Sequence, residues 1–174
     1  MAAHKFNQPL NNWDVSNVKS MHSMFADAYI FNQPLDKWDV SNVTDLSNLF
    51  KYAQMFNEPL ANWNISRVTN MSFMFSEAEC FNQPLNDLDV SNVTDMSSMF
   101  AGANSFNHPF SYLNLRTVIY MSQMFNNAYA FNQPLNDWDV SNVTDMSSMF
   151  AGAESFNQPL KDWNVGNVLD MSSI

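Results

Sequence analysis

Residues 131–155 carry the stretch FNQPLNDWDVSNVTDMSSMFAGAES, and almost the same text stands at residues 81–105. Looser copies fill the rest of the 174 residues, each 25 residues long, with no insertion or deletion. The units begin at Phe6, Phe31, Phe56, Phe81, Phe106, Phe131 and Phe156. A fixed period of this length is typical of a solenoid, in which each unit buries its apolar face against its neighbours. We therefore predict a single solenoid domain over residues 1–174.

The two ends of the sequence lack the atypical capping repeats, with a polar outer face, that close most solenoids. The first unit begins almost at once, and Ile174 lies in the middle of a unit. The expectation is that the chain is an excised piece of a longer array, or that further repeats or other subunits make end-to-end contacts with it.

Composition excludes several classes of protein. The net charge is −10, which argues against nucleic acid as a partner because such binding needs a basic surface. The one cysteine, Cys80, rules out an internal disulfide, and we expect it to be a small buried filler. No apolar run is long enough to span a membrane, and the first residues, MAAHK, are too few and too polar for a signal peptide.

Each unit opens with Phe-Asn-Gln-Pro-Leu or a close variant of it, a turn in which proline prevents a helix. The Asn at the second position occurs in all seven units, and we expect it to hydrogen-bond to the backbone of its own or the next coil. Trp-Asp-Val then alternates apolar and polar residues, which predicts a short half-buried strand and, in the stack, a parallel β-sheet.

The second half of the unit, as in Val93–Ala103, places apolar residues at i, i+3, i+6, i+7 and i+10. This spacing predicts a short α or 3-10 helix with one apolar stripe. The stripe is rich in Met and Phe. A methionine-rich stripe can form a promiscuous binding groove, but its recurrence in every unit favours a buried core.

The run Trp-Asp-Val-Ser-Asn-Val-Thr-Asp-Met-Ser-Ser-Met-Phe, joined to Phe-Asn-Gln-Pro-Leu, resembles the 25-residue repeat of the BspA-like leucine-rich-repeat surface proteins, of the mycoplasma lipoprotein-type or DUF285 kind. The resemblance covers all seven units. It implies a leucine-rich-repeat-like solenoid with a parallel β-sheet on one face and short helices and turns on the other. It also implies surface display, adhesion or protein interaction, and a cell-surface or extracellular location, and it carries over no catalytic residues.

Catalytic chemistry is not expected, because catalysis needs unlike groups that converge at one point, whereas a repeat spreads like groups along lines. The three histidines lie at three different unit positions, and no Cys/His spacing suits zinc. We predict no enzyme activity, no cofactor and no metal. Columns of Asp could hold Ca²⁺, as in a calcium-dependent adhesin, but a solvated acidic face is the favoured reading.

The unit of residues 106–130 departs most from the others on its expected outer face. Tyr112 and Tyr120 replace Asn or Asp, Arg116 replaces Ser, and His108 replaces Gln. Tyr and Arg are enriched at binding hot spots, although neutral drift in a tolerant repeat would also produce these changes. The hypothesis is a protein-binding patch made of these residues and of nearby carboxylates: Tyr112, Arg116, Tyr120, His108, Asp87, Asp89, Asp137 and Asp139.

The function expected from the sequence is thus a non-enzymatic protein–protein interaction or adhesion module. Two alternatives remain: a structural or scaffold subunit packed inside a larger multiprotein assembly, and a Ca²⁺-dependent adhesin.

Overall fold

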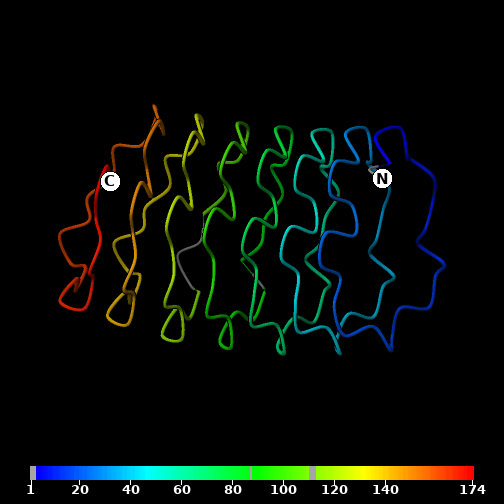
Figure 1. Ribbon diagram of the computed structural model, residues 1–174, viewed down its shortest axis with the longest axis horizontal. Helices are drawn as coiled ribbons and strands as arrows, with labels where there is room; N and C mark the ends of the chain where they lie inside the picture. Colours follow the sequence, from blue (N-terminus) through cyan, green and yellow to red (C-terminus); the bar gives the residue numbers. More distant parts are fainter. Residues whose placement is uncertain (1–2, 87, 110–112) are drawn as a thin grey trace.

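The computed structural model describes residues 3–86, 88–109 and 113–174. The chain winds as a stack of coils along one axis, with its two ends at opposite ends of that axis (Figure 1). Isolated parallel bridges join like positions of successive coils at a spacing of 25 residues. These bridges are Ser20–Asp45, Asp45–Asn70, Asn70–Asp95, Asp95–Tyr120, Tyr120–Asp145 and Asp145–Asp170.

The predicted leucine-rich-repeat-like solenoid, with a parallel β-sheet on one face and short helices on the other, is wrong. Among the described residues there is no helix and no strand, and the only β pairing consists of the six isolated bridges. The backbone consists of turns and of segments without regular structure.

The segment predicted as a helix is a run of four-residue turns. Met24 N donates to Met21 O at 3.1 Å, and Ser23, the third residue of that turn, has a φ of 56°. A positive φ at this place is the mark of a type II turn and is incompatible with a right-handed helix. The same geometry recurs four residues later, where Asp27 has a φ of 60°. A four-residue turn repeat spaces apolar residues almost as a helix of 3.6 residues does, so the apolar pattern could not separate the two.

Backbone N–H groups that do not close these turns donate to the next coil. In the first coil, the bonds run from Met21 N to Asp45 O (3.0 Å), Ser23 N to Ser47 O (3.0 Å), Phe25 N to Leu49 O (2.9 Å) and Asp27 N to Lys51 O (2.8 Å). Successive N–H groups thus alternate between a partner in their own coil and a partner in the next, which leaves neither a helix ladder nor a continuous strand.

The predicted strand shows the expected burial but not the expected backbone. Trp38 and Val40 are buried and Asp39 between them is exposed. Trp38 N, however, donates to Leu35 O, and Val43 N donates to Val40 O. Turns on both sides leave too few extended residues for a strand.

Aromatic columns fill the core. The Phe that opens each unit stacks on its counterparts, as Phe56 does on Phe81 at 6.0 Å between ring centroids, and the second Phe of the unit does the same. The two columns also contact each other, with 3.8 Å between the ring centroids of Phe50 and Phe56. Trp38 stacks on Trp63 at 6.5 Å. The Met-rich stripe is buried in the interior coils, as the core interpretation predicted, whereas Met24 is 39% exposed and Met171 is 44% exposed.

Candidate functional site

The repeated Asn side chain is a structural element, as predicted. Asn57 Oδ1 accepts hydrogen bonds from Asn82 N at 2.8 Å and from Gln83 Nε2 at 3.1 Å. In the same way, Asn32 Oδ1 accepts a hydrogen bond from Asn57 N at 2.9 Å. From Asn7 to Asn132, this acceptor is therefore occupied by a bond from the next coil.

The columns of Asp close turns. Asp14 Oδ1 accepts from both the N–H and the hydroxyl of Ser16, and Asp45 Oδ1 does the same with Ser47. An Asp or Asn side chain that bonds to the backbone two residues on is the ordinary Asx turn. The hydrogen bonds donated by the hydroxyl and N–H of Ser16 lower the pKa of Asp14. These carboxylates therefore close turns of their own coil, and Asp45 Oδ2 also accepts from Ser20 Oγ of the preceding coil at 3.3 Å.

The described residues contain no group of three or more His, Cys, Asp or Glu side chains placed to hold a metal ion. They also contain no helix long and apolar enough to cross a membrane.

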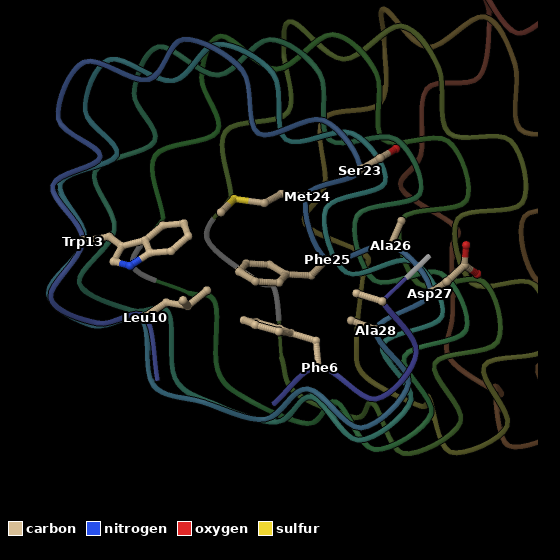
Figure 2. Close-up of a pocket in the computed structure, with 10 residues that line it drawn as sticks. Phe6, Leu10, Trp13, Ser23, Met24, Phe25, Ala26, Asp27 and Ala28 are labelled. Carbon is tan, nitrogen blue, oxygen red and sulfur yellow. The ribbon is translucent and has the colours of Figure 1, made fainter. Parts of the chain in front are cut away.

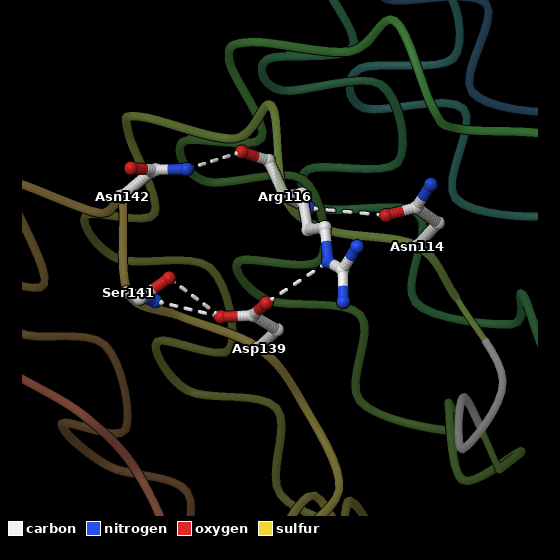
Figure 3. Close-up of polar contacts among 5 residues, drawn as sticks. All are labelled: Asn114, Arg116, Asp139, Ser141 and Asn142. Carbon is white, nitrogen blue, oxygen red and sulfur yellow. Dashed lines mark hydrogen bonds and ion pairs between the residues drawn. The ribbon is translucent and has the colours of Figure 1, made fainter.

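The Arg116 side chain is 76% exposed. Figure 3 shows its guanidinium directed toward Asp139. Its Nε donates to Asp139 Oδ2 of the following coil at 3.1 Å. Its backbone is held on both sides, since its N–H donates to Asn114 Oδ1 at 3.4 Å and its carbonyl accepts from Asn142 Nδ2 at 2.7 Å. In another coil with Asn two residues earlier, the consensus Ser donates its hydroxyl to that Asn, as Ser66 Oγ does to Asn64 Oδ1 at 2.8 Å.

Asp139 links the guanidinium to the scaffold. Its Oδ1 accepts from Ser141 Oγ at 2.6 Å and from Ser141 N at 3.2 Å, while its Oδ2 faces Arg116. These bonds from Ser141, followed by the bond and charge of Arg116, lower the pKa of Asp139. The Asp139 side chain is 43% exposed, so Asp139 and Arg116 form a surface ion pair.

Tyr120 lies in the same coil as Arg116 and is 47% exposed. Its backbone pairs with both neighbouring coils, and Met96 N donates to Tyr120 O at 3.0 Å. As it lacks a carboxylate, it cannot form the Asx turn that Asp95 makes with Ser97 N at 2.8 Å. The replacement gives up a turn bond and exposes an aromatic ring.

The other predicted patch residues do not join Arg116 through any described contact. His108 is half-buried, and Asp89 and Asp137 are exposed. The pKa of Asp89 is lowered by the hydrogen bonds from Ser91. Tyr112 and Asp87 lie outside the described residues. Of the predicted site, the structure brings together Arg116 and Asp139.

Sequence reasoning missed a set of exposed apolar side chains and predicted the wrong environment for Cys80. Cys80 was expected to be buried, and that prediction is wrong, because the thiol is exposed. It shares the last unit position with two exposed apolar residues, Ile30 and Met55, and Tyr29 and Tyr52 are exposed nearby in the sequence. The signal was present: this position varies among Ile, Met, Cys, Ser and Ala, as exposed positions do, whereas the core columns hardly change.

Comparison with known proteins identifies the family. The family model described as "Mycoplasma protein of unknown function, DUF285" matches the chain twice, over residues 1–88 and 79–174. No curated protein and no solved structure matches the chain. The two matches together span all the units, in agreement with the resemblance carried by the repeated motif, and the chain therefore belongs to the DUF285 family.

Proposed function

We propose that this protein is a non-enzymatic protein–protein interaction or adhesion module and that the face around Arg116 binds the partner. The observation that carries the proposal is the 76% exposure of the Arg116 side chain in a stack whose repeated polar columns are occupied by their own hydrogen bonds.

The ion pair with Asp139 leaves Arg116 able to bind a partner. An exposed pair of this kind contributes about 0–1 kcal/mol, so little is lost when a partner replaces it. Only Nε of the guanidinium is engaged among the described residues, and an arginine side chain carries five N–H donors. Arg and Tyr are also the side chains that carry most binding energy at interfaces, and Tyr120 adds an exposed ring on the same coil.

The absence of catalysis is part of the proposal. Aspartates repeat along columns, and several of them are held by serines of their own coils, as Asp14 and Asp139 are. Such an arrangement offers extended recognition surfaces. It does not bring unlike groups together around one reacting atom, as catalysis requires.

The test compares the wild-type chain with the double variant Arg116→Ser, Tyr120→Asp, which restores the consensus residues. Each is immobilised, proteins from a cell extract are captured and identified by mass spectrometry, and the affinity of the strongest binder is measured with purified protein. Loss of two hot-spot side chains is expected to weaken binding by about tenfold or more.

Lys161→Asp is the matched control, because it changes the net charge by the same two units at an exposed site in another coil. It is expected to bind as the wild type does. Equal affinity of the wild type and the double variant for every captured protein would overturn the proposal.

A scaffold subunit inside a larger assembly is the second candidate function. The observation that favours it is that apolar side chains at the last position of successive units are exposed, as Ile30 is at 46% and Met55 at 51%.

A further inference from the structure

One edge of the stack carries charged side chains whose sign alternates from coil to coil. This edge, called the turn edge below, consists of residues 14–19 of the first coil and their counterparts in the other coils: 39–44, 64–69, 89–94, 114–119, 139–144 and 164–169. Its charged residues, in chain order and all exposed, are Asp14, Lys19, Asp39, Arg67, Asp89, Arg116 and Asp139. Asp14 and Lys19 cancel in the first coil, so the second to sixth coils follow with charges of −1, +1, −1, +1 and −1.

The alternation arises from paired replacements. In the third and fifth coils, which carry the arginines, the Asp that begins the edge elsewhere is replaced by Asn64 and Asn114. The amide closes the same turn as the carboxylate, since Ser66 N donates to Asn64 Oδ1 at 3.2 Å and Ser141 N donates to Asp139 Oδ1 at 3.2 Å. The replacements therefore reverse the sign of the coil and keep its turn.

Hydrogen bonds hold the edges of successive coils in register. Thr44 N donates to Lys19 O at 2.8 Å, and Thr69 N donates to Thr44 O at 2.9 Å. Trp13, which directly precedes the turn edge, points toward Phe25, and the following coils take nearly the same path behind it (Figure 2). The alternating charges thus lie in a row along the stack.

Several of these charges are not neutralised within the chain. Arg67 Nη1 donates to Asn42 Oδ1 at 2.9 Å, and Lys19 Nζ donates to the same neutral oxygen at 3.4 Å. Among the described residues, no ion pair forms with either cation or with Asp39 or Asp89. A partner that presents opposite charges in the matching order would compensate them.

A second copy of the chain matches this row of charges only in certain orientations. A two-fold axis along the stack sets each coil opposite its own counterpart, so that like charges meet. A two-fold axis across the stack reverses the order of the coils. Where such an axis passes between the third and fourth coils, the third coil faces the fourth and the second faces the fifth, so that each positive coil meets a negative one.

We propose that two copies of this chain associate antiparallel through their turn edges, about a two-fold axis between the third and fourth coils. The ion pairs, each made twice by symmetry, join Arg67 to Asp89, Arg116 to Asp39, and Lys19 to Asp139 of the other copy. An axis between the fourth and fifth coils also opposes unlike charges, but it leaves Lys19 without a carboxylate. The inference rests on the proposed function, since it names a second copy as the partner of the Arg116 face.

Sedimentation equilibrium of the 174-residue chain measures the association, at protein concentrations up to about 1 mM and at about 0.05 M and about 0.5 M salt. The wild type is expected to form a dimer and no larger species, because a two-fold contact closes on itself. Its dissociation constant is expected to rise about tenfold or more at the higher salt concentration, because salt screens exposed ion pairs.

Two variants test the pairing of the charges. Arg67→Glu, Arg116→Glu makes every charge from the second to the sixth coil negative. Asp39→Asn, Asp89→Asn removes the carboxylates that face the arginines and keeps the turns, as Asn64 does in its own coil. Each variant alone is expected to associate about tenfold or more weakly than the wild type.

Mixing the two variants is the decisive arm. Asp39 and Asp89 of the first variant then face Arg116 and Arg67 of the second, so the equimolar mixture is expected to form a heterodimer tighter than either homodimer. Arg67→Gln, Arg116→Gln replaces the first variant if circular dichroism shows that it is unfolded.

Lys37→Glu, Lys161→Glu is the matched control for the first variant. It changes the net charge by the same four units at exposed sites outside the turn edge and is expected to dimerise as the wild type does.

A wild type that stays monomeric up to about 1 mM overturns the proposal, as does a mixture that associates no more tightly than its components. If the wild type is monomeric but Arg116→Ser, Tyr120→Asp abolishes the capture of another protein, the proposed function stands and only the second copy fails as its partner.

Discussion

At the scale of single residues, one amide side chain joins each coil to the next. Asn offers an acceptor to a backbone N–H and to a Gln amide, as Asn57 does for Asn82 and Gln83, and it does so without charge. Aspartate in the same column would stack like charges at coil spacing, which raises the free energy of the ionised forms.

Asn57→Ala is expected to lower the free energy of unfolding by about 1–2 kcal/mol, because it leaves the Asn82 N–H and the Gln83 amide without their acceptor. Denaturant unfolding at low protein concentration measures the change. Asn157→Ala is the matched control, since no described donor reaches its Oδ1, and it is expected to cost little. Equal losses in the two variants would contradict a structural role for the ladder.

The turn carboxylates make stability depend on pH. Burial raises the pKa of Asp45, but the hydrogen bonds from the Ser47 hydroxyl, the Ser47 N–H and the Ser20 hydroxyl together outweigh it, so the pKa lies below its usual value of 3.8. A carboxyl whose pKa is lowered by folding stabilises the fold above the pKa of the unfolded chain, and that contribution is lost as the pH falls through the folded pKa.

Acidification from about pH 7 to about pH 3 is therefore expected to destabilise the wild type more than Asp45→Asn. Asn keeps the turn without titrating, as Asn70 does by accepting from Ser72 N at 2.9 Å. Unfolding free energies of both proteins at the two pH values supply the measurement, and parallel pH profiles would refute the assigned role.

At the scale of the element, the repeated unit is built from turns because two of its positions adopt a left-handed backbone. Gly fills the second of these positions in two coils, at Gly102 and Gly152, with φ of 71° and 75°. Asp27 and Tyr52 adopt φ of 60° at the same place, so side chains are tolerated there with strain. Interlocking turns with bonds to both neighbours stabilise a backbone that would not persist in an isolated unit.

Gly152→Ala is expected to lower the free energy of unfolding by about 1 kcal/mol, because alanine is strained at positive φ and its Cβ would stand 2.1 Å from Asn127 Oδ1. Gly166→Ala is the control: its φ is not left-handed and its nearest neighbour is Asn164 Oδ1 at 3.2 Å, so a change below about 0.5 kcal/mol is expected. Thermal melting compares them, and equal effects would contradict the turn assignment.

At the scale of the whole molecule, every ladder depends on the same 25-residue register. The Asn column, the aromatic columns and the backbone bridges all connect residues 25 apart, so each coil is interchangeable with its neighbours. Stability in such a stack comes from coil-to-coil contacts, which a shift by one residue would break together.

Deletion of residues 56–80, one whole unit, is therefore expected to leave a folded chain that melts cooperatively. Deletion of residues 57–80 leaves one surplus residue in the coil before Phe81, and this variant is expected to melt at a lower temperature because the coil must expel that residue to restore the ladders. Calorimetry of the two variants is the measurement; equal melting temperatures would show that the register is not strict.

The sequence by itself determined the period, the boundaries of the units, the buried aromatic and methionine columns and the structural role of the Asn ladder. These follow from residue identity repeated at fixed spacing, which shows which side chains share an environment. It also pointed to Arg116, since a departure from an otherwise constant outer column is visible without coordinates.

Only the tertiary structure decided the backbone. The sequence predicted a helix and a strand, and both predictions are wrong. A turn repeat of four residues spaces apolar side chains almost as a helix does. Turns on both sides of Trp-Asp-Val leave too few extended residues for a strand. The left-handed φ of Ser23 has no signal in residue type, and that of Asp27 is indicated only by the glycines at the same unit position, Gly102 and Gly152. They are fixed by hydrogen bonds to the neighbouring coil, and those partners lie 24 residues away along the chain.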